Sequence, residues 1–291
     1  MRLRRCSHLS AIGILVGAIW FGLAGPPIAA TTMVPLSLDQ LVQASSCIVR
    51  GRPIAQQSTW NSQHTELVTL TTIAVEQSLK GGAPGTIVVE QPGGQSGSYR
   101  VTVPGTVHFQ PGNSYVLFLE PAPPDLQQPV ERFLLVGLLQ GTYRIYTDAV
   151  TGEERVIRPM AGVVYSNPGS QNLTADTLPL RGFRSEMESV LRTPLVIPAG
   201  VRFPLTVVRT LPEGAGRLHV EAQTTAPLFP NAHLALPAGS SVEGEATLAD
   251  GTWKIRWTSV SVRGKRAPIR GATELTAGES LSGMRVVVEA R

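Results

Sequence analysis

The sequence is poor in cysteine and in aromatic residues. Of its 291 residues, two are cysteine and 5% are Phe, Trp or Tyr. Cys6 lies in an amino-terminal segment that we expect to be removed, so Cys47 has no partner for an internal disulfide. Cys47 begins an apolar run with Ile48 and Val49, which favours a buried small side chain over the alternative of a nucleophile. A fold held together by disulfides is therefore excluded.

Short motifs with a known catalytic mechanism are also missing. The chain has no His-Glu-x-x-His, Gly-x-Ser-x-Gly, Cys-x-x-Cys or phosphate-binding Walker loop. His64 and Glu66 alternate, so one strand face could hold them as a two-ligand metal corner, although a surface pair is the simpler interpretation. His108 is expected to be a strand residue, and His219 and His233 have no acidic or cysteine neighbours at ligand spacing.

Three acidic residues could supply oxygen ligands to a cation such as calcium. Asp148, Glu153 and Glu154 lie close together, but their spacing matches no EF-hand calcium loop. We therefore predict no catalytic residue, no metal and no cofactor, and we expect a protein that is not an enzyme.

The sequence has no long apolar run. Its longest one lies near the amino terminus and is short. Three arginines among the first five residues precede an uncharged apolar run over about residues 11–23, and Ala29 and Ala30 follow. A membrane-spanning helix needs roughly twenty apolar residues, so this run is short for an anchor. The layout predicts a secretory signal peptide over residues 1–30, with an uncleaved anchor as the alternative. We expect a periplasmic or extracellular protein with no stable membrane span after cleavage.

Little net charge is left after this cleavage. Removing the three arginines from the 25 basic residues leaves 22 against 21 acidic ones, a formal charge of about +1. A nearly neutral chain gives no reason to expect nucleic-acid binding. The expected partners are other envelope or extracellular proteins. The length favours two domains.

Glycine and proline, by contrast, are abundant. The chain has 29 Gly and 23 Pro, and between them lie short runs rich in Val, Ile, Leu, Thr and Tyr. This pattern predicts a mainly all-β protein with two barrel-like domains, an OB-like one and then a possibly duplicated one. Strands are predicted over residues 47–54, 67–78, 86–91, 99–103, 114–119, 133–139, 143–147 and 155–158.

Two helical patterns interrupt the strands. Ser37 can cap a short helix with Gln40 three residues later, and a second helix is predicted over about residues 180–191, ended by Pro194. We expect the second helix to connect the domains and dock on one of them. The predicted domains are 31–165 with a carboxy-terminal hairpin, 166–194 as linker and connector helix, and 195–291.

The first domain resembles a known family over about residues 37–120. A short helix runs into the strand from Cys47, a long strand ends in Ser78-Leu79-Lys80-Gly81, and a later strand follows Phe109. This pattern resembles the OB-fold barrel of tissue inhibitors of metalloproteinases and netrin modules, in the version of exported bacterial proteins. Those inhibitors use an amino-terminal cysteine, whereas the mature chain is expected to begin near Thr31. The resemblance implies the fold and not the inhibitory chemistry.

The second domain contains a regular spacing. Ala-Gly pairs end at Gly200, Gly239 and Gly278, 39 residues apart, and the first two follow a proline. Either the spacing is a coincidence or these glycines are structural turns of a duplicated barrel.

The same region resembles the β-barrel domain of TrbI-type conjugal-transfer proteins of type IV secretion systems. The resemblance covers about residues 195–275, including the two Pro-Ala-Gly turns and the segment from Trp253 to Trp257. These two tryptophans share a strand face, where they either pack in a core or form a possible contact for a partner.

The functional hypothesis is an exported, non-catalytic scaffold or binding protein of the bacterial cell envelope or extracellular space. One alternative is a component of a conjugation or type IV secretion channel. Another is a protease-inhibitor-like module or an unrecognised enzyme.

Overall fold

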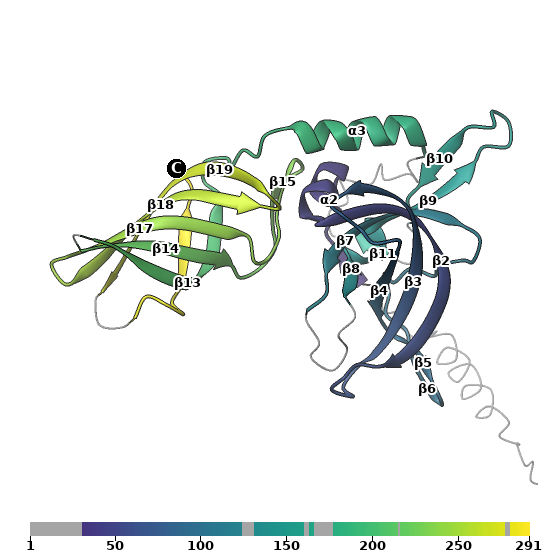
Figure 1. Cartoon of the computed structure of the whole chain (residues 1–291), viewed down its shortest axis with the longest axis horizontal. Helices are drawn as coiled ribbons and strands as arrows, with labels where there is room; N and C mark the ends of the chain where they lie inside the picture. Colours follow the sequence, from purple (N-terminus) through teal and green to yellow (C-terminus); the bar gives the residue numbers. More distant parts are fainter. Residues whose placement is uncertain (1–30, 124–130, 160–162, 166–176, 215, 277–279) are drawn as a thin grey trace, which may run out of the picture.

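The computed structural model describes residues 31–123, 131–159, 163–165, 177–214, 216–276 and 280–291. The protein is mostly β and barrel-like, as the composition predicts, and its strands form two units that helix α3 bridges along one side (Figure 1). None of the helices in these ranges is both long and apolar enough to cross a membrane. The predicted signal peptide lies outside the described residues.

The first unit precedes residue 193. Its strands are β1 (Thr31–Met33), β2 (Cys47–Trp60), β3 (Leu67–Lys80), β4 (Thr86–Pro92), β5 (Gly94–Ser96), β6 (Tyr99–Val101), β7 (Ser114–Pro121), β8 (Arg132–Leu135), β9 (Thr142–Thr147), β10 (Glu154–Ile157), β11 (Val163–Tyr165) and β12 (Leu178–Pro179). Its helices are α2 (Leu38–Ala44), the 3-10 turn η1 (Leu138–Gly141) and α3 (Leu180–Arg192).

A closed ring of strands forms the centre of this unit. Strand β2 pairs with β3, β3 with β4, β4 with β8, β8 with β7, and β7 with β2 again. The β4–β8 pair is parallel and the others are antiparallel. Closure leaves these strands without an open edge, and the ring surrounds an apolar core that includes Val49, Ile73 and Leu117.

The two helices cover the outside of this ring. Ser37 caps α2 through the predicted capping box, in which its hydroxyl accepts from Gln40 N and the Gln40 side chain accepts from Ser37 N. Helix α3 packs Phe183, Met187 and Val190 into the same apolar cluster as Leu41 of α2. The connector helix therefore docks on the first unit.

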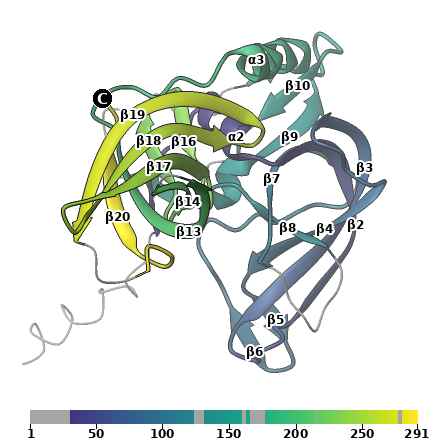
Figure 2. The same cartoon turned by 60° about the vertical axis from the view of Figure 1, so that its left-hand side comes forward.

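The second unit is one curled antiparallel sheet. Its strands are β13 (Arg202–Gly214), β14 (Arg217–Thr224), β15 (Leu228–Asn231), β16 (Leu234–Leu236), β17 (Ser241–Ala249), β18 (Thr252–Val262), β19 (Lys265–Thr276) and β20 (Arg285–Glu289). The large sheet has the order β19-β18-β17-β14-β13-β20, and β15 with β16 forms a separate hairpin. Figure 2 shows β19 curving back toward β20. Arg291 N, just after β20, donates to Arg270 O of β19 at 2.7 Å, so the barrel is nearly closed.

Two of the spaced glycines occupy matching turns in this sheet. Gly200 has φ 85° and Gly239 has φ 77°, values that favour glycine. Gly200 N donates to Ala290 O and Ala290 N donates to Val201 O. In the same way, Gly239 N donates to Thr224 O and Thr224 N donates to Ser240 O. Gly278 lies outside the described residues.

The predicted strand over residues 133–139 is too long. Strand β8 ends at Leu135, and the chain turns into η1 because Gly137 adopts the left-handed region with φ 65°. A side chain at Gly137 would collide with Leu36 Cδ1, 2.6 Å from the ideal Cβ position. In the predicted linker and connector helix over residues 166–194, residues 166–176 lie outside the described residues, and Leu178 belongs to β12.

Candidate functional site

The two units meet where α2 of the first unit contacts the β15–β16 hairpin of the second. We call this contact the seam, defined by residues 37–44 and 229–235. The Gln43 side chain is bonded at both ends to the hairpin backbone: its Nε2 donates to His233 O at 2.6 Å, and its Oε1 accepts from Ala235 N at 3.1 Å. Gln40 Nε2 donates to Asn231 O at 2.7 Å. The helix thus binds the hairpin edge through amide side chains.

Apolar packing continues across the seam. Ala235 of the hairpin is fully buried and belongs to the apolar cluster of the first unit, together with Leu41 and Phe183. Phe229 packs against the same cluster. The seam also contains an ion pair, with His233 Nδ1 2.8 Å from Asp39 Oδ2, but His233 is largely exposed and such pairs contribute little. Burial and the amide hydrogen bonds are therefore the main stabilising contacts.

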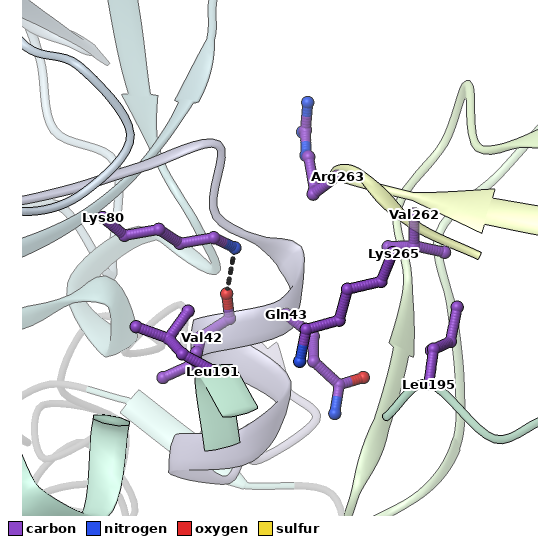
Figure 3. Close-up of a pocket in the computed structure, with 8 residues that line it drawn as sticks. All are labelled: Val42, Gln43, Lys80, Leu191, Leu195, Val262, Arg263 and Lys265. Atoms are coloured by element: carbon purple, nitrogen blue, oxygen red, sulfur yellow. Dashed lines mark hydrogen bonds between the residues drawn. The ribbon is translucent and has the colours of Figure 1, made fainter. Parts of the chain in front are cut away.

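Three cations gather beside the seam at the carboxyl ends of both helices. Lys80 Nζ donates to Val42 O of α2 at 2.6 Å (Figure 3). It also donates, at 2.6 Å, to the carbonyl of Ser45, the residue that ends α2. From the second unit, Arg263 Nε donates to Ala44 O at 3.2 Å, and Lys265 Nζ donates to Val190 O of α3 at 2.9 Å. Carboxyl ends of helices carry unpaired carbonyls and a partial negative charge, so cations stabilise them. The second unit thus caps both helices of the first.

A small pocket of about 110 Å³ lies among these groups. Lys80, Lys265 and Arg263 line it together with apolar side chains that include Leu191 and Leu195 (Figure 3). Because both lysines already donate to main-chain carbonyls, structural capping accounts for their placement.

Lys80 gives the seam a pH dependence. Burial, and next the positive charges of Arg263 and Lys265, lower the pKa of Lys80 from 10.5 to about 8. Below pH 8 the side chain is charged in both the folded and unfolded states, and the burial penalty is fully present. Between about pH 8 and 10.5 the unfolded chain binds more protons than the folded one, so this contribution makes stability rise with pH.

We expect Lys80→Met to remove this contribution. Urea unfolding at several pH values should show the free energy of unfolding of the wild type rising relative to that of Lys80→Met between about pH 8 and 10.5. Lys254→Met is the control, because Lys254 is exposed on β18. Parallel pH curves for the wild type and Lys80→Met would contradict the expected shift.

Cys47 and two of the histidines belong to three different segments of the first unit. Cys47 is buried with a free thiol, and burial raises its pKa, which disfavours the nucleophilic thiolate. His64 is in the turn between β2 and β3 with φ 55°, so it does not form the strand-face pair with Glu66 that alternation allowed. His108 is exposed in the segment before β7.

The expectation that His219 and His233 lack acidic neighbours is wrong. His219 Nδ1 lies 3.5 Å from Glu213 Oε1, and its Nε2 lies 3.8 Å from Glu221 Oε1. Glu213 is brought there by the β13–β14 hairpin, whereas the alternation of His219 and Glu221 was visible in the sequence. The partner of His233 is Asp39, 194 residues away, for which no local signal exists.

The three acidic residues considered as calcium ligands make other contacts. Asp148 Oδ1 accepts from Val150 N and Thr151 N, both at 2.9 Å, and so closes the β9–β10 turn. Glu153 faces Arg181 at 3.1 Å, and Glu154 faces Arg50 at 2.7 Å. Across the described ranges, no group of three or more His, Cys, Asp or Glu residues is placed to hold a metal.

The two tryptophans differ in exposure. Trp257 is fully buried in the core of the second unit, and its Nε1 donates to Thr273 Oγ1 at 3.0 Å. Trp253 is half-buried against the same core. The strand face that the two tryptophans share could either pack in a core or contact a partner. Contact with a partner is wrong for Trp257, because this face points into the barrel.

Nothing in the sequence indicated that Gln40 and Gln43 join the two units. Gln40 was noted only as part of a capping box, and Gln43 carries no motif at all.

Comparisons of the chain with family models, curated proteins and solved structures gave no significant match.

Proposed function

We propose that the chain is an exported, non-catalytic scaffold or binding protein of the bacterial cell envelope or extracellular space, whose two β units work as one rigid unit. The seam carries this proposal. A hydrogen-bonded and partly apolar contact, with cations of one unit capping helices of the other, stabilises one relative orientation. A fixed orientation presents two surfaces to a partner at a constant separation.

The two resemblances are part of the proposal. The ring order β2-β3-β4-β8-β7, with its parallel β4–β8 pair, supports an OB-like first domain. The matching turns at Gly200 and Gly239 support a duplicated, TrbI-like second domain. Such a domain leaves a role in a secretion channel as the second candidate function.

The non-catalytic part of the proposal is tested by removing reactive side chains. We expect the triple variant Cys47→Ala/His64→Ala/His219→Ala to restore a gene-deletion strain of the native host as well as the wild type does. Circular dichroism and thermal melts would confirm that the variant folds. A folded triple variant that behaves like the deletion would contradict a purely contact-based role, and the single variants would then locate the reactive group.

A further inference from the structure

A polar pocket of about 460 Å³ lies at one end of the ring in the first unit. We call it the mouth pocket, lined by residues 56, 58, 69, 91–95, 100–103 and 106–108. It is bounded by the far ends of β2 and β3, by the end of β4, and by the small β5–β6 hairpin, which Figure 1 shows at the end of the ring away from α3. Mouths of β-barrels are frequent ligand sites, and this volume is within the range of small-molecule pockets.

The side chains in this mouth follow from strand alternation. On β2, Gln56 and Ser58 share a face, and the register places Ser58 opposite Thr69 of β3. Thr69 in turn is opposite Gln91 of β4. Deeper in the ring the same face carries Ile73, which is fully buried in the core. The interior therefore changes from apolar side chains to amides and hydroxyls toward the mouth.

Several of these polar groups are buried and held in place. Gln91 is 2% exposed, and its amide is fixed by the backbone of Val107, donating to Val107 O at 3.2 Å and accepting from Val107 N at 2.8 Å. The Ser58 and Thr69 hydroxyls are 3.0 Å apart. One rung deeper, Thr71 is fully buried, and its hydroxyl has no hydrogen-bond partner among the described residues. Buried polar groups are costly without partners.

Gly94 keeps the hairpin close to these hydroxyls. It has φ 138°, and a Cβ at this position would lie 2.5 Å from Thr69 Oγ1. Any other residue would push the β5–β6 hairpin away from the strands and open the pocket wall.

An aromatic pair stands beside the mouth. Trp60 shares the strand face of Ser58, and its ring lies edge-on to Tyr99 of β6 with centroids 5.7 Å apart. Tyr99 is 63% exposed, although aromatic rings of this size are usually covered. The adjacent Arg100 is oriented by Gln95 Oε1, which accepts from its Nε at 3.2 Å.

The lining chemistry narrows the class of ligand. None of the lining residues is Asp or Glu, so the pocket offers no carboxylate to a cation. Arg100 and His108 are the charged or titratable side chains of the lining. Two such side chains give little positive charge to bind a multiply charged anion. Amides and hydroxyls beside an exposed aromatic ring suit a neutral ligand with many hydroxyl groups and flat apolar C–H faces.

We propose that the mouth pocket binds a neutral oligosaccharide, with one sugar hydrogen-bonded to Gln56 and the next stacked on Tyr99. This ligand class makes the proposed binding function more specific, and it rests on that proposed function. It is independent of the seam, so either part can fail alone.

Isothermal titration calorimetry of the mature chain tests the proposal. The probes are three neutral hexasaccharides, β-1,4-linked glucose, N-acetylglucosamine and mannose, with the acidic hexagalacturonate as a fourth. We expect saturable binding of at least one neutral probe. Gln56→Ala and Tyr99→Ala should each weaken it about tenfold, the equivalent of one hydrogen bond or one stacking contact. Both side chains are exposed, so the variants should fold, which thermal melts would verify.

Gln57→Ala is the matched control, because Gln57 is the next residue of β2 and points to the opposite face. It should bind like the wild type. Failure of all three neutral probes at millimolar concentration would overturn the proposal, and so would binding of hexagalacturonate alone. Equal binding by Gln56→Ala, Tyr99→Ala and the wild type would place the sugar elsewhere and would also overturn it. None of these results bears on the triple variant or on the rigidity of the seam, so this failure is distinct from failure of the proposed function.

Discussion

Replacing Trp257 by Ala should lower the free energy of unfolding by about 3–5 kcal/mol, the range for removing a large aromatic side chain from a packed core. Trp257 is fully buried among the apolar side chains of the second unit, and its indole N–H bonds to Thr273. The ideal Cβ position at Gly244, on the neighbouring strand, is 3.0 Å from the indole ring, so the surrounding backbone is closely packed and has little freedom to fill the cavity. Single-domain proteins are stable by only about 5–15 kcal/mol, so the loss is a large fraction.

Trp253→Ala is the matched control for this prediction. Trp253 is on the same strand face but is half-buried near the strand end, so we expect a loss of about 1 kcal/mol. Urea unfolding of both variants, followed by circular dichroism, measures the difference. Equal losses would mean that the two tryptophans are equally exposed in solution.

The second large effect is expected at Phe183 of α3. Phe183→Ala should cost about 3–5 kcal/mol, because the ring is 1% exposed and packs on Tyr143 and Phe118, with centroids 4.6 Å and 6.3 Å away. The loss should appear in the first unit, since α3 docks there. Ser185→Ala on the exposed side of the helix should be nearly neutral.

Hydrogen exchange followed by mass spectrometry would locate the Phe183 effect. We expect faster exchange in α3, α2 and the strands beneath them, with β17 to β19 little changed. Faster exchange confined to the second unit would show that the helix packs there instead.

Local patterns accounted for much of the fold. The capping box at Ser37 and Gln40 gave the start of α2, and alternation gave most strands of the first unit to within a few residues. Strand β2 extends to Trp60, six residues beyond the predicted end, because pairing with β3 continues through polar positions such as Gln56 and Ser58 that carry no alternating apolar signal.

The seam could not be predicted in the same way. Its contacts join residues about 190 positions apart, as between Gln43 and His233, and a surface glutamine on a helix is an ordinary residue in sequence. Likewise, Gln56 and Gln91 line one pocket only after the pairing of β2 with β3 and of β3 with β4 places the two strands' polar ends side by side. Long-range topology, and not local propensity, forms both sites.

The most direct test of the account is a distance measurement between the two units. Spin labels at Gln57→Cys on β2 and Val287→Cys on β20, both exposed, in a Cys47→Ala background would report on their separation by double electron–electron resonance. A rigid seam predicts one narrow distance distribution, and Gln43→Ala, which leaves Ala235 N and His233 O without their amide partner, should broaden it. A broad distribution in the chain with an intact seam would contradict the claim that the two β units act as one.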